Sequence, residues 1–440
     1  MESSNKVIIV GAGIGGLASG HFLSEAGRSV EIFERARIPG GRIQLLEKDG
    51  ARVDVGTQYF HTNYVETYKL LETVGMKDKL IPIHPPVQMI RDGRGYPVKH
   101  NTIRYKIVPF WSNLKFGRFV LTTLINFGRL DPYYNDPLPE FEDIELADYV
   151  LRKCDKETLE FLVRPIICAF NLSDPEGESL AHFLRICKQF LTASDMVLPG
   201  GMFSFPQALA ARLPVTYNAD VKQIIVESNQ VRGVQVGIGK EVRRIETKDV
   251  ICATPLKELP HLLPSLNDVE KKGVNAFKYS QFPLANFFMK RKISGNQWAY
   301  VLSRSEDFKT AYTSDAAVKC GEMVPSGKSV LQTWFAGEAG YQLIDEPDEK
   351  IIALAKKEMN RVMPSFESEI ESAEIVRHHT GMPRYQVGAY RMLRDFLESI
   401  RRIKGLHLVG DYYGHSTLET VVRSARRATD KLLEAASPFS

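Results

Sequence analysis

The chain has 440 residues, of which 44% are hydrophobic and 25% charged, and its formal net charge is +4 at pH 7. This length allows two or three globular domains, and the composition is ordinary for a soluble protein. Because the net charge is small and basic and acidic residues are interspersed, we expect no nucleic acid as a partner.

The cysteines and the start of the chain indicate the cellular compartment in which we expect the protein. The five cysteines are scattered and form no CxxC pair, which favours reduced thiols over disulfides or a metal site. They are Cys154, Cys168, Cys187, Cys252 and Cys320. A strand is predicted within six residues of the start, so we expect no signal peptide, and no run of 18 uncharged apolar residues predicts a spanning helix. We therefore expect a cytoplasmic protein without a metal.

The first 34 residues predict a dinucleotide-binding unit. A β-branched run at 6–10 precedes a glycine-rich turn at 11–16, a helical pattern at 17–27 and a second β-rich run at 29–33. Glu34 follows that run, at the usual distance for an acid that holds a ribose hydroxyl.

The glycines of this turn have separate tasks. Gly11 makes the tight turn, Gly13 lets backbone N–H groups approach a pyrophosphate, and Gly16 lets helix and strand pack closely. The start of the helix adds partial positive charge for the phosphates. The next turn, Pro39-Gly-Gly-Arg42, is a loop that can lie against a flat or anionic ligand, and Arg42 can reach a phosphate.

The middle of the chain carries no second nucleotide motif. A short strand is expected at 51–60 and helices at 63–75, 114–130, 144–162 and 179–191. The amphipathic helix at 114–130 either touches a membrane surface, lines the mouth of an apolar substrate channel, or packs within a helical subdomain.

The second half returns to β structure. Three β-rich runs at 215–226, 231–238 and 244–253 predict a meander. Strands at 280–290, 299–302 and 329–335 and a helix at 350–362 predict a second, substrate-side sheet. A buried strand at 405–409, then Gly410-Asp411 and a helix at 417–435, return to the first unit. An acid between a strand and a helix N-terminus suits a sugar-like hydroxyl chain.

These motifs in this order resemble the flavin-containing amine oxidase superfamily. The strongest matches are the glycine-rich turn at 11–16, Glu34 with Pro39-Gly-Gly-Arg42, and Gly410-Asp411. The resemblance implies an α/β fold with a Rossmann-type, glutathione-reductase-like FAD-binding domain built from segments 1–75, 195–265 and 376–440. Segments 76–194 and 266–375 would form a mixed-sheet substrate domain with a helical insertion.

The resemblance also implies a non-covalent FAD, because no C-terminal cysteine is available for a thioether link. Glu34 would hold the adenosine ribose, Val221 would meet adenine through its backbone, and Asp411 would bind the ribityl chain or phosphate. The residues implied at the cofactor are Gly11, Gly13, Ile14, Gly15, Gly16, Glu34, Arg35, Gly41, Arg42, Gly56, Thr57, Val221, Thr254, Gly410, Asp411, Leu418, Glu419 and Thr420, the last two through backbone N–H groups.

The sequence does not decide which branch of the superfamily the chain resembles most. The stretch 380–390 resembles both protoporphyrinogen oxidases and amine oxidases, so Tyr385 and Tyr390 are candidates for a pocket over the flavin, as is Tyr59. Each can equally be core. His378 and His379 are either acid/base or substrate contacts, or simply the end of a strand.

The resemblance favours hydride removal from a bulky hydrophobic or conjugated substrate, as in protoporphyrinogen oxidases and desaturases, with oxygen or a quinone-like acceptor. Amine oxidases often hold a water with a strand lysine, and the stretch 282–288 has none. The alternatives are an amine or amino-acid oxidase, and a flavin- or NAD-binding protein without turnover. Peripheral membrane contact is possible in either enzyme.

Overall fold

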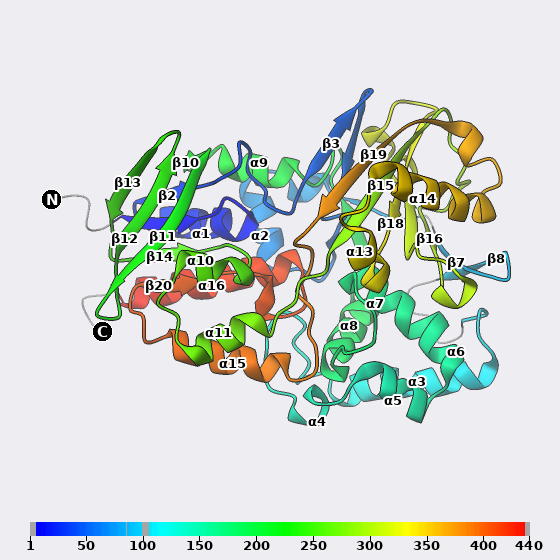
Figure 1. Cartoon of the computed structure of the whole chain (residues 1–440), viewed down its shortest axis with the longest axis horizontal. Helices are drawn as coiled ribbons and strands as arrows, with labels where there is room; N and C mark the ends of the chain where they lie inside the picture. The colour runs from blue at the N-terminus through cyan, green and yellow to red at the C-terminus, as the bar shows by residue number, and fades with distance from the viewer. Residues whose placement is uncertain (1–5, 85, 99–104, 436–440) are drawn as a thin grey trace.

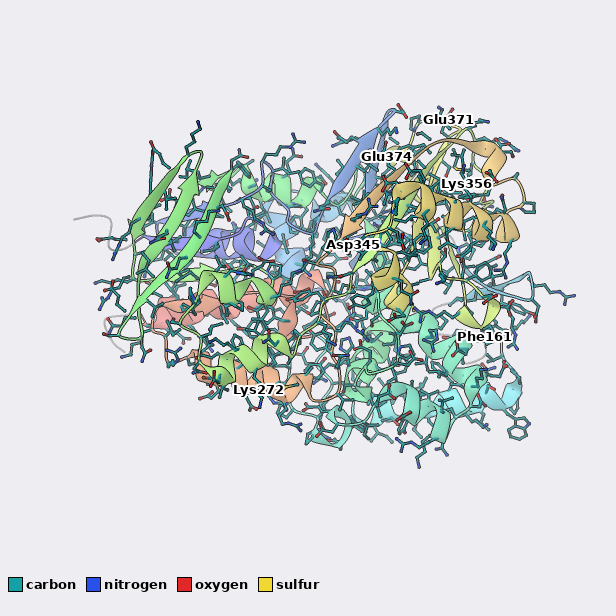
Figure 2. All side chains as sticks on the ribbon, viewed as in Figure 1. Phe161, Lys272, Asp345, Lys356, Glu371 and Glu374 are labelled. Atoms are coloured by element: carbon teal, nitrogen blue, oxygen red, sulfur yellow. The ribbon has the colours of Figure 1, made fainter. Side chains whose placement is uncertain are left out.

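The computed structural model describes residues 6–84, 86–98 and 105–435 (Figure 1). The ends of the predicted segments 1–75 and 376–440, and part of 76–194, lie outside the described residues. The molecule is an α/β protein with several sheets, which confirms the predicted class at that level. Apolar side chains fill several buried clusters, and charged side chains such as Lys272, Asp345 and Glu371 are exposed around them (Figure 2).

A five-stranded parallel sheet contains the first and last predicted strands. Its order is β10 (Val215–Thr216), β2 (Val30–Phe33), β1 (Val7–Val10), β14 (Val250–Cys252) and β20 (Leu406–Leu408). Helices α1 (Ile14–Glu25) and α16 (Leu418–Ala435) pack against each other beside it. Because both faces of such a sheet are covered, its strands are continuous apolar runs rather than alternating ones. The carboxyl ends of β1, β2, β14 and β20 consequently meet at one edge.

The predicted three-stranded meander is present, but its first and last strands are shorter than the predicted runs. It consists of β11 (Ala219–Glu227), β12 (Gln230–Ile238) and β13 (Glu241–Glu246), all antiparallel. The outer two predicted runs are each divided, because β10 and β14 join the parallel sheet instead. Asn218 has a φ of +51°, a left-handed conformation that separates β10 from β11.

A seven-stranded mixed sheet forms the other large layer. Its strands pair antiparallel except for β16 with β7, which pair parallel. Its order is β19 (Ile370–His378), β15 (Phe282–Met289), β18 (Ser329–Trp334), β17 (Tyr312–Asp315), β16 (Ala299–Val301), β7 (Val87–Arg91) and β8 (Arg94–Val98). Helices α13 (Gly337–Leu343) and α14 (Asp348–Val362) pack on β15. Strand β19 crosses the boundary expected at 375/376, and the domain division remains a prediction.

A helical part with its own buried core lies at the lower right of Figure 1. It contains α3 (Phe110–Ile125), α4 (Pro139–Glu142), α5 (Leu146–Lys153), α6 (Lys156–Thr158), a π-helical turn (Leu159–Val163), α7 (Arg164–Asn171) and α8 (Leu180–Thr192). The single helix expected at 144–162 is broken because Asp155 stops α5 and caps α6, accepting a hydrogen bond from the Thr158 N–H at 2.8 Å.

Short elements connect these layers. The helices are α2 (Glu66–Thr73), α9 (Ser204–Ala210), α10 (Leu259–Leu262), α11 (Asp268–Asn275), α12 (Ala316–Lys319) and α15 (Ala389–Ile400). The strands are β3 (Leu45–Lys48), β4 (Ala51–Asp54), β5 (Phe60–His61), β6 (Ile81–Pro82) and β9 (Asp195–Val197).

Candidate functional site

The glycine-rich turn lies where β1 leads into α1. Gly11 has a φ of +98°, a conformation that glycine adopts without strain. A Cβ on Gly16 would lie 1.9 Å from the Gly11 carbonyl oxygen, so only glycine allows the helix to start this close to the strand. Gly13 precedes α1 and has no side chain to cap it, which leaves the first backbone N–H groups of the helix for another acceptor.

Glu34 and the meander lie beside this turn. The Glu34 carboxylate accepts hydrogen bonds from the Ala12 N–H at 2.6 Å and the Ala36 N–H at 2.9 Å. The Ala219 N–H donates to the Glu34 carbonyl at 2.9 Å, which brings the start of β11 next to the acid. Val221 is on β11, an edge strand of the meander, with its side chain in the core. The Arg35 side chain is 67% exposed and points toward Glu258.

The loop at 40–42 packs against the same turn. The Gly40 N–H donates to the Ala12 carbonyl at 2.8 Å. From this loop, Arg42 Nη1 lies 2.6 Å from Asp411 Oδ2 and 2.7 Å from the Gly381 carbonyl. Burial lowers the pKa of Arg42, but the charge of Asp411 and its hydrogen bond outweigh burial and raise the pKa overall. Two motifs 369 residues apart in sequence are thus joined by one ion pair.

Asp411 follows β20 and retains unused hydrogen-bonding capacity. Its Oδ2 also accepts from Ser416 Oγ at 2.6 Å. Its Oδ1 is buried and has no hydrogen-bond partner among the described residues. A buried carboxylate oxygen without a donor is costly, so the site fits a ligand that brings a hydroxyl group.

The start of α16 differs in part from expectation. Thr417 Oγ1 accepts from the Thr420 N–H at 3.2 Å, so the helix's own N-cap takes one of the amides expected to face the flavin. The Glu419 carboxylate accepts from the Glu66 and Thr67 amides at 3.0 and 2.9 Å and thereby caps α2. Leu418 is the first residue of the helix.

The remaining cofactor candidates are close to the turn and the loop. A Cβ on Gly56 would lie 1.9 Å from the Arg42 carbonyl oxygen, and Thr57 follows it. Thr254 is beside Gly11, and its hydroxyl is 3.3 Å from Cys252 Sγ. A Cβ on Gly15 would lie 2.8 Å from the Val409 side chain, just before Gly410. The structure therefore brings these predicted residues to one edge of the parallel sheet.

Two of the three candidate tyrosines lie side by side, and the third contacts other rings. Tyr385 and Tyr390 are fully buried with ring centroids 4.9 Å apart, and Tyr385 donates from its hydroxyl to the Asp411 carbonyl at 2.9 Å. Tyr390 starts α15, and its hydroxyl lies 2.9 Å from His182 Nδ1. In the described chain Tyr59 contacts the rings of His61 and Trp298 instead. Tyr390 packs in the core, which is the second of the two interpretations that the sequence left open for it.

The aromatic rings around Trp334 form a second feature of the site. Trp334 on β18 stacks on Tyr312 with ring centroids 5.2 Å apart and contacts Phe282, which stacks on His378 at 4.7 Å. His378 ends β19, as the second interpretation expected, and burial lowers its pKa to about 4. Its backbone contact is Val55, directly before Gly56. These aromatic rings therefore approach the cofactor candidates from the seven-stranded sheet.

The sequence did not identify a buried ion pair beneath this region. Lys319 Nζ lies 3.2 Å from Asp54 Oδ2 and 2.9 Å from Gln58 Oε1, and the side chains of Lys319 and Asp54 are 1% and 0% exposed. Gln332 also donates to the Asp54 carbonyl. Gln332 stands out as a polar residue in an apolar strand, whereas Lys319 lies in the one-turn helix α12, which no motif marks.

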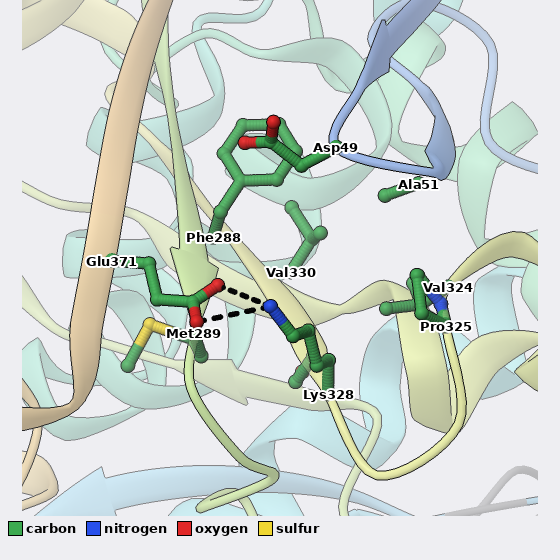
Figure 3. Close-up of a pocket in the computed structure, with 10 residues that line it drawn as sticks. Asp49, Ala51, Phe288, Met289, Val324, Pro325, Lys328, Val330 and Glu371 are labelled. Carbon is green, nitrogen blue, oxygen red and sulfur yellow. Dashed lines mark hydrogen bonds and ion pairs between the residues drawn. The ribbon is translucent and has the colours of Figure 1, made fainter.

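A separate small pocket lies at the turn between β3 and β4 (Figure 3). Asp49 and Phe288 line it, and Lys328 pairs with Glu371 across it at 2.7 Å. None of its lining residues is a cofactor candidate, so it plays no part in the site described above.

Comparisons with known proteins identify the family of this chain. The family model described as flavin containing amine oxidoreductase matches residues 14–433. The coproporphyrinogen III oxidase of Bacillus subtilis is 21% identical over 93% of this chain and 94% of its own length. A probable zeta-carotene desaturase of Synechococcus elongatus is 23% identical over 98% of this chain and 99% of its own.

Among solved structures, cyclohexylamine oxidase from Brevibacterium oxydans has a TM-score of 0.76 at 16% identity, covering 98% of this chain and 99% of that one. At this identity the likeness shows a shared fold.

Proposed function

The chain belongs to the flavin-containing amine oxidoreductase family, and from that premise we propose that it removes hydride from a bulky hydrophobic or conjugated substrate. Family membership makes it an oxidoreductase with FAD as cofactor, as the sequence predicted. The proposal adds the substrate class, the residues of the site and a non-covalent mode of binding. Oxygen or a quinone-like compound would accept the electrons.

The ion pair between Arg42 and Asp411 is the observation that carries the assignment of the site. It joins the loop after the first βαβ unit to the turn before the last helix. Both lie at the carboxyl edge of the parallel strands, where ligands bind in open α/β sheets. The unpaired Asp411 Oδ1 supports a hydroxyl-rich ligand there, such as a ribityl chain.

Each element would contribute one part of the binding. The uncapped start of α1 would hold the pyrophosphate, since backbone N–H groups and the helix dipole favour an anion. Glu34 would exchange its bond to the Ala12 N–H for a ribose hydroxyl. Arg42 would hold the Asp411 carboxylate in position through their ion pair. The edge strand β11 would offer backbone groups near Val221 to adenine, as part of a FAD-binding unit of Rossmann type.

When bound, FAD supplies the hydride acceptor, so the protein must orient a C–H bond and exclude water. The buried rings of Phe282 and Trp334, with Tyr312 stacked on Trp334, would form an apolar wall behind the substrate side. His378, kept neutral by burial, adds no charge to that surface. This environment suits the bulky apolar part of a substrate, in line with the coproporphyrinogen III oxidase and the probable zeta-carotene desaturase among the relatives. The likeness to cyclohexylamine oxidase supports an amine as the second candidate.

The absorption spectrum of the purified protein tests the cofactor, and Asp411→Asn tests the site. We expect flavin bands that leave with the supernatant on denaturation. Losing the charge beside Arg42 should weaken FAD binding about 10- to 100-fold, because a buried charged hydrogen bond contributes about 1.5–3 kcal/mol. Asp430→Asn, on the exposed side of α16, is the control and should bind like the wild type.

Anaerobic bleaching of the bound flavin then tests the substrate. Porphyrinogens or polyenes should bleach it and amines should not. Bleaching by amines alone would select the second candidate, and no bleaching by any donor would favour a flavin-binding protein without turnover. A protein that stays colourless after incubation with FAD would contradict the proposal altogether.

A further inference from the structure

One face of α3 presents large apolar side chains to solvent. They are Phe110, Trp111, Leu114, Leu121, Leu124 and Ile125, and each is between 56% and 74% exposed. Their spacing of three, four and seven residues places them along one side of the helix. We call these six residues the α3 face.

The opposite side of α3 is the less apolar one. It packs on the helical core through Phe116 and Phe119, but also through the buried side chains of Ser112, Asn113 and Thr123. A surface helix of a globular protein normally has the reverse arrangement, with polar residues outside. Packing within the molecule therefore does not account for the α3 face, and contiguous exposed patches of this kind mark interaction surfaces.

The charged residues within the segment that contains α3 all have one sign. Residues 106–130 contain no aspartate or glutamate, but contain Lys106, Lys115, Arg118 and Arg129. Lys115 and Arg129 each pair with an acid outside this stretch. Arg118 is exposed between the apolar residues and has no ion-pair partner among the described residues. An apolar stripe with an unpaired, exposed arginine beside it is complementary to a surface that is both apolar and anionic.

We propose that α3 lies in the plane of a membrane surface that contains anionic lipids, with the α3 face inserted into the headgroup and acyl boundary. Its 16 residues give a length of about 24 Å. No helix within the described ranges is long and apolar enough to cross a bilayer. Phe110 and Trp111 at one end are the residue types that anchor at the interface.

A second copy of the chain is the less suitable occupant. A two-fold interface through the α3 face would place Arg118 of both copies, which has no ion-pair partner among the described residues, in the same interface. Like charges opposed in this way weaken association, whereas anionic headgroups neutralise them. The inference extends the peripheral contact that the sequence allowed, and it does not depend on the proposed substrate or cofactor.

Vesicle flotation of the full-length protein tests the proposal. We expect it to float with phosphatidylcholine vesicles containing phosphatidylserine, more weakly with pure phosphatidylcholine, and more weakly at high salt. The double variant L121E/I125E should reduce the bound fraction at least tenfold, because each substitution removes a large apolar contact with the bilayer. V242E is the matched control, since Val242 is 64% exposed on β13.

Tryptophan fluorescence gives a second readout. Of the three tryptophans, Trp298 and Trp334 are buried and Trp111 is 67% exposed. Anionic vesicles should shift the emission to the blue, brominated lipids should quench it, and W111F should abolish both effects while leaving most of the flotation. Circular dichroism checks that every variant is folded.

Three results would overturn the proposal: no flotation with either vesicle, equal flotation of L121E/I125E and V242E, or light scattering that shows a dimer lost in L121E/I125E. The flavin spectrum is read on the same samples, so loss of membrane binding and loss of the cofactor are distinguished.

Discussion

At the scale of single residues, the ion pair of Asp54 and Lys319 is the most deeply buried charge contact described above. Asp54 Oδ1 also accepts from the Met202 N–H at 2.8 Å, so the pair links the strand before Gly56 to two other segments. Burial raises the pKa of Asp54 although Lys319 opposes this. Such a pair gives little net stability, but removing one partner leaves the other charge buried alone.

We therefore expect Lys319→Met to lower the free energy of unfolding by about 3–5 kcal/mol. The matched control is Lys328→Met, which removes the partly exposed pair with Glu371 and should cost less than about 1 kcal/mol. The double variant D54N/K319M should recover part of the loss. Denaturant unfolding measures all three, and equal losses in K319M and K328M would contradict the role of burial.

The low pKa of His378 predicts a dependence of stability on pH. Its pKa is about 4 in the folded protein and 6.5 ordinarily, so between these values the unfolded state binds a proton that the folded state does not. The stabilisation is fully present above pH 6.5 and is lost as the pH falls toward 4, by about 3 kcal/mol for this residue.

His378→Gln should flatten that part of the pH profile of unfolding, whereas the exposed His261→Gln should leave it unchanged. Burial also lowers the pKa of His415 to about 3, so some slope will remain in H378Q. A profile identical to the wild type in H378Q would show that His378 is not the group responsible.

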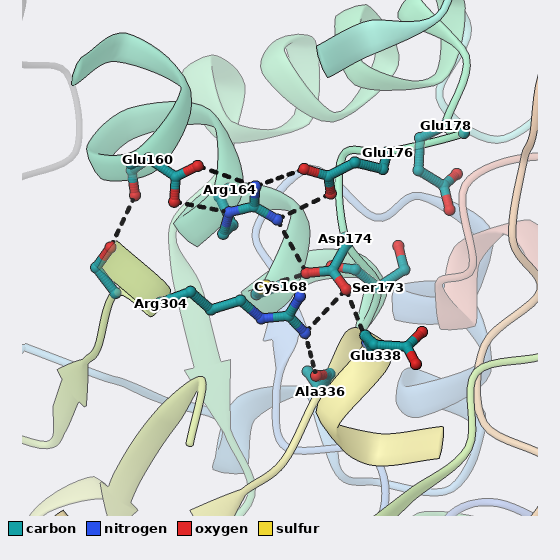
Figure 4. A network of polar contacts seen from close by, with 12 residues as sticks. Glu160, Arg164, Cys168, Ser173, Asp174, Glu176, Glu178, Arg304, Ala336 and Glu338 are labelled. Carbon is teal, nitrogen blue, oxygen red and sulfur yellow. Dashed lines mark hydrogen bonds and ion pairs between the residues drawn. The ribbon is translucent and has the colours of Figure 1, made fainter. Parts of the chain in front are cut away.

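At the scale of elements, a buried network ties the helical part to the seven-stranded sheet (Figure 4). Arg164, at the start of α7, pairs with Glu160, Asp174 and Glu176 at 2.6–3.1 Å. Asp174 also pairs with Arg304 at 2.9 Å and accepts from the Glu338 N–H at the start of α13 at 2.7 Å. Asp174 is thus shared between two arginines from different layers.

Asp174→Asn should loosen this junction by about 3 kcal/mol, because the buried Arg164 and the half-buried Arg304 lose their shared carboxylate. Hydrogen exchange should then quicken in α7 and α13 together while α16 stays protected. Glu140→Gln, which breaks the exposed pair with Arg129, is the control. If exchange quickened in α7 alone, the network would not be what couples the two parts.

Local signals explain which elements were predictable. The strand, turn and helix at 7–25, and the helices α14 and α16, follow from apolar period and turn glycines within a few residues. The bounds of the meander and of the helix at 144–162 were predicted only in part, because each break depends on a single residue. The left-handed Asn218 separates β10 from β11, and Asp155 caps α6. Gly11, Arg42 and Asp411 were identifiable from motifs, but the Thr417 cap of α16 and the partner of Asp54 depend on tertiary contacts.

At the scale of the whole molecule, the site is assembled from segments spread along the chain. The glycine-rich turn, the loop at 40–42, the start of β11 and the turn after β20 all contribute. A ligand that touches all of them stabilises the folded chain as a unit, by RT ln(1 + [L]/Kd).

FAD at 100 times its Kd should therefore raise the free energy of unfolding by about 2.7 kcal/mol, and the melting temperature should rise with FAD concentration. Adenosine diphosphate, which lacks the ribityl chain that Asp411 would hold, is the control and should give a smaller rise. A melting temperature that is insensitive to FAD would contradict the assembled site.

The distance in sequence between Arg42 and Asp411 also governs how the protein is made. Domains fold from the N-terminus during synthesis at about 5–20 residues per second, so the ribosome needs roughly 20–75 s to travel from Arg42 to Asp411. During the first part of that time β14, which pairs with β1 in the finished sheet, has not been made. During the rest of it, β20 and α16 are still missing. The site joined by this ion pair is therefore complete only late in synthesis, so we expect FAD to bind after β20 and α16 have been made.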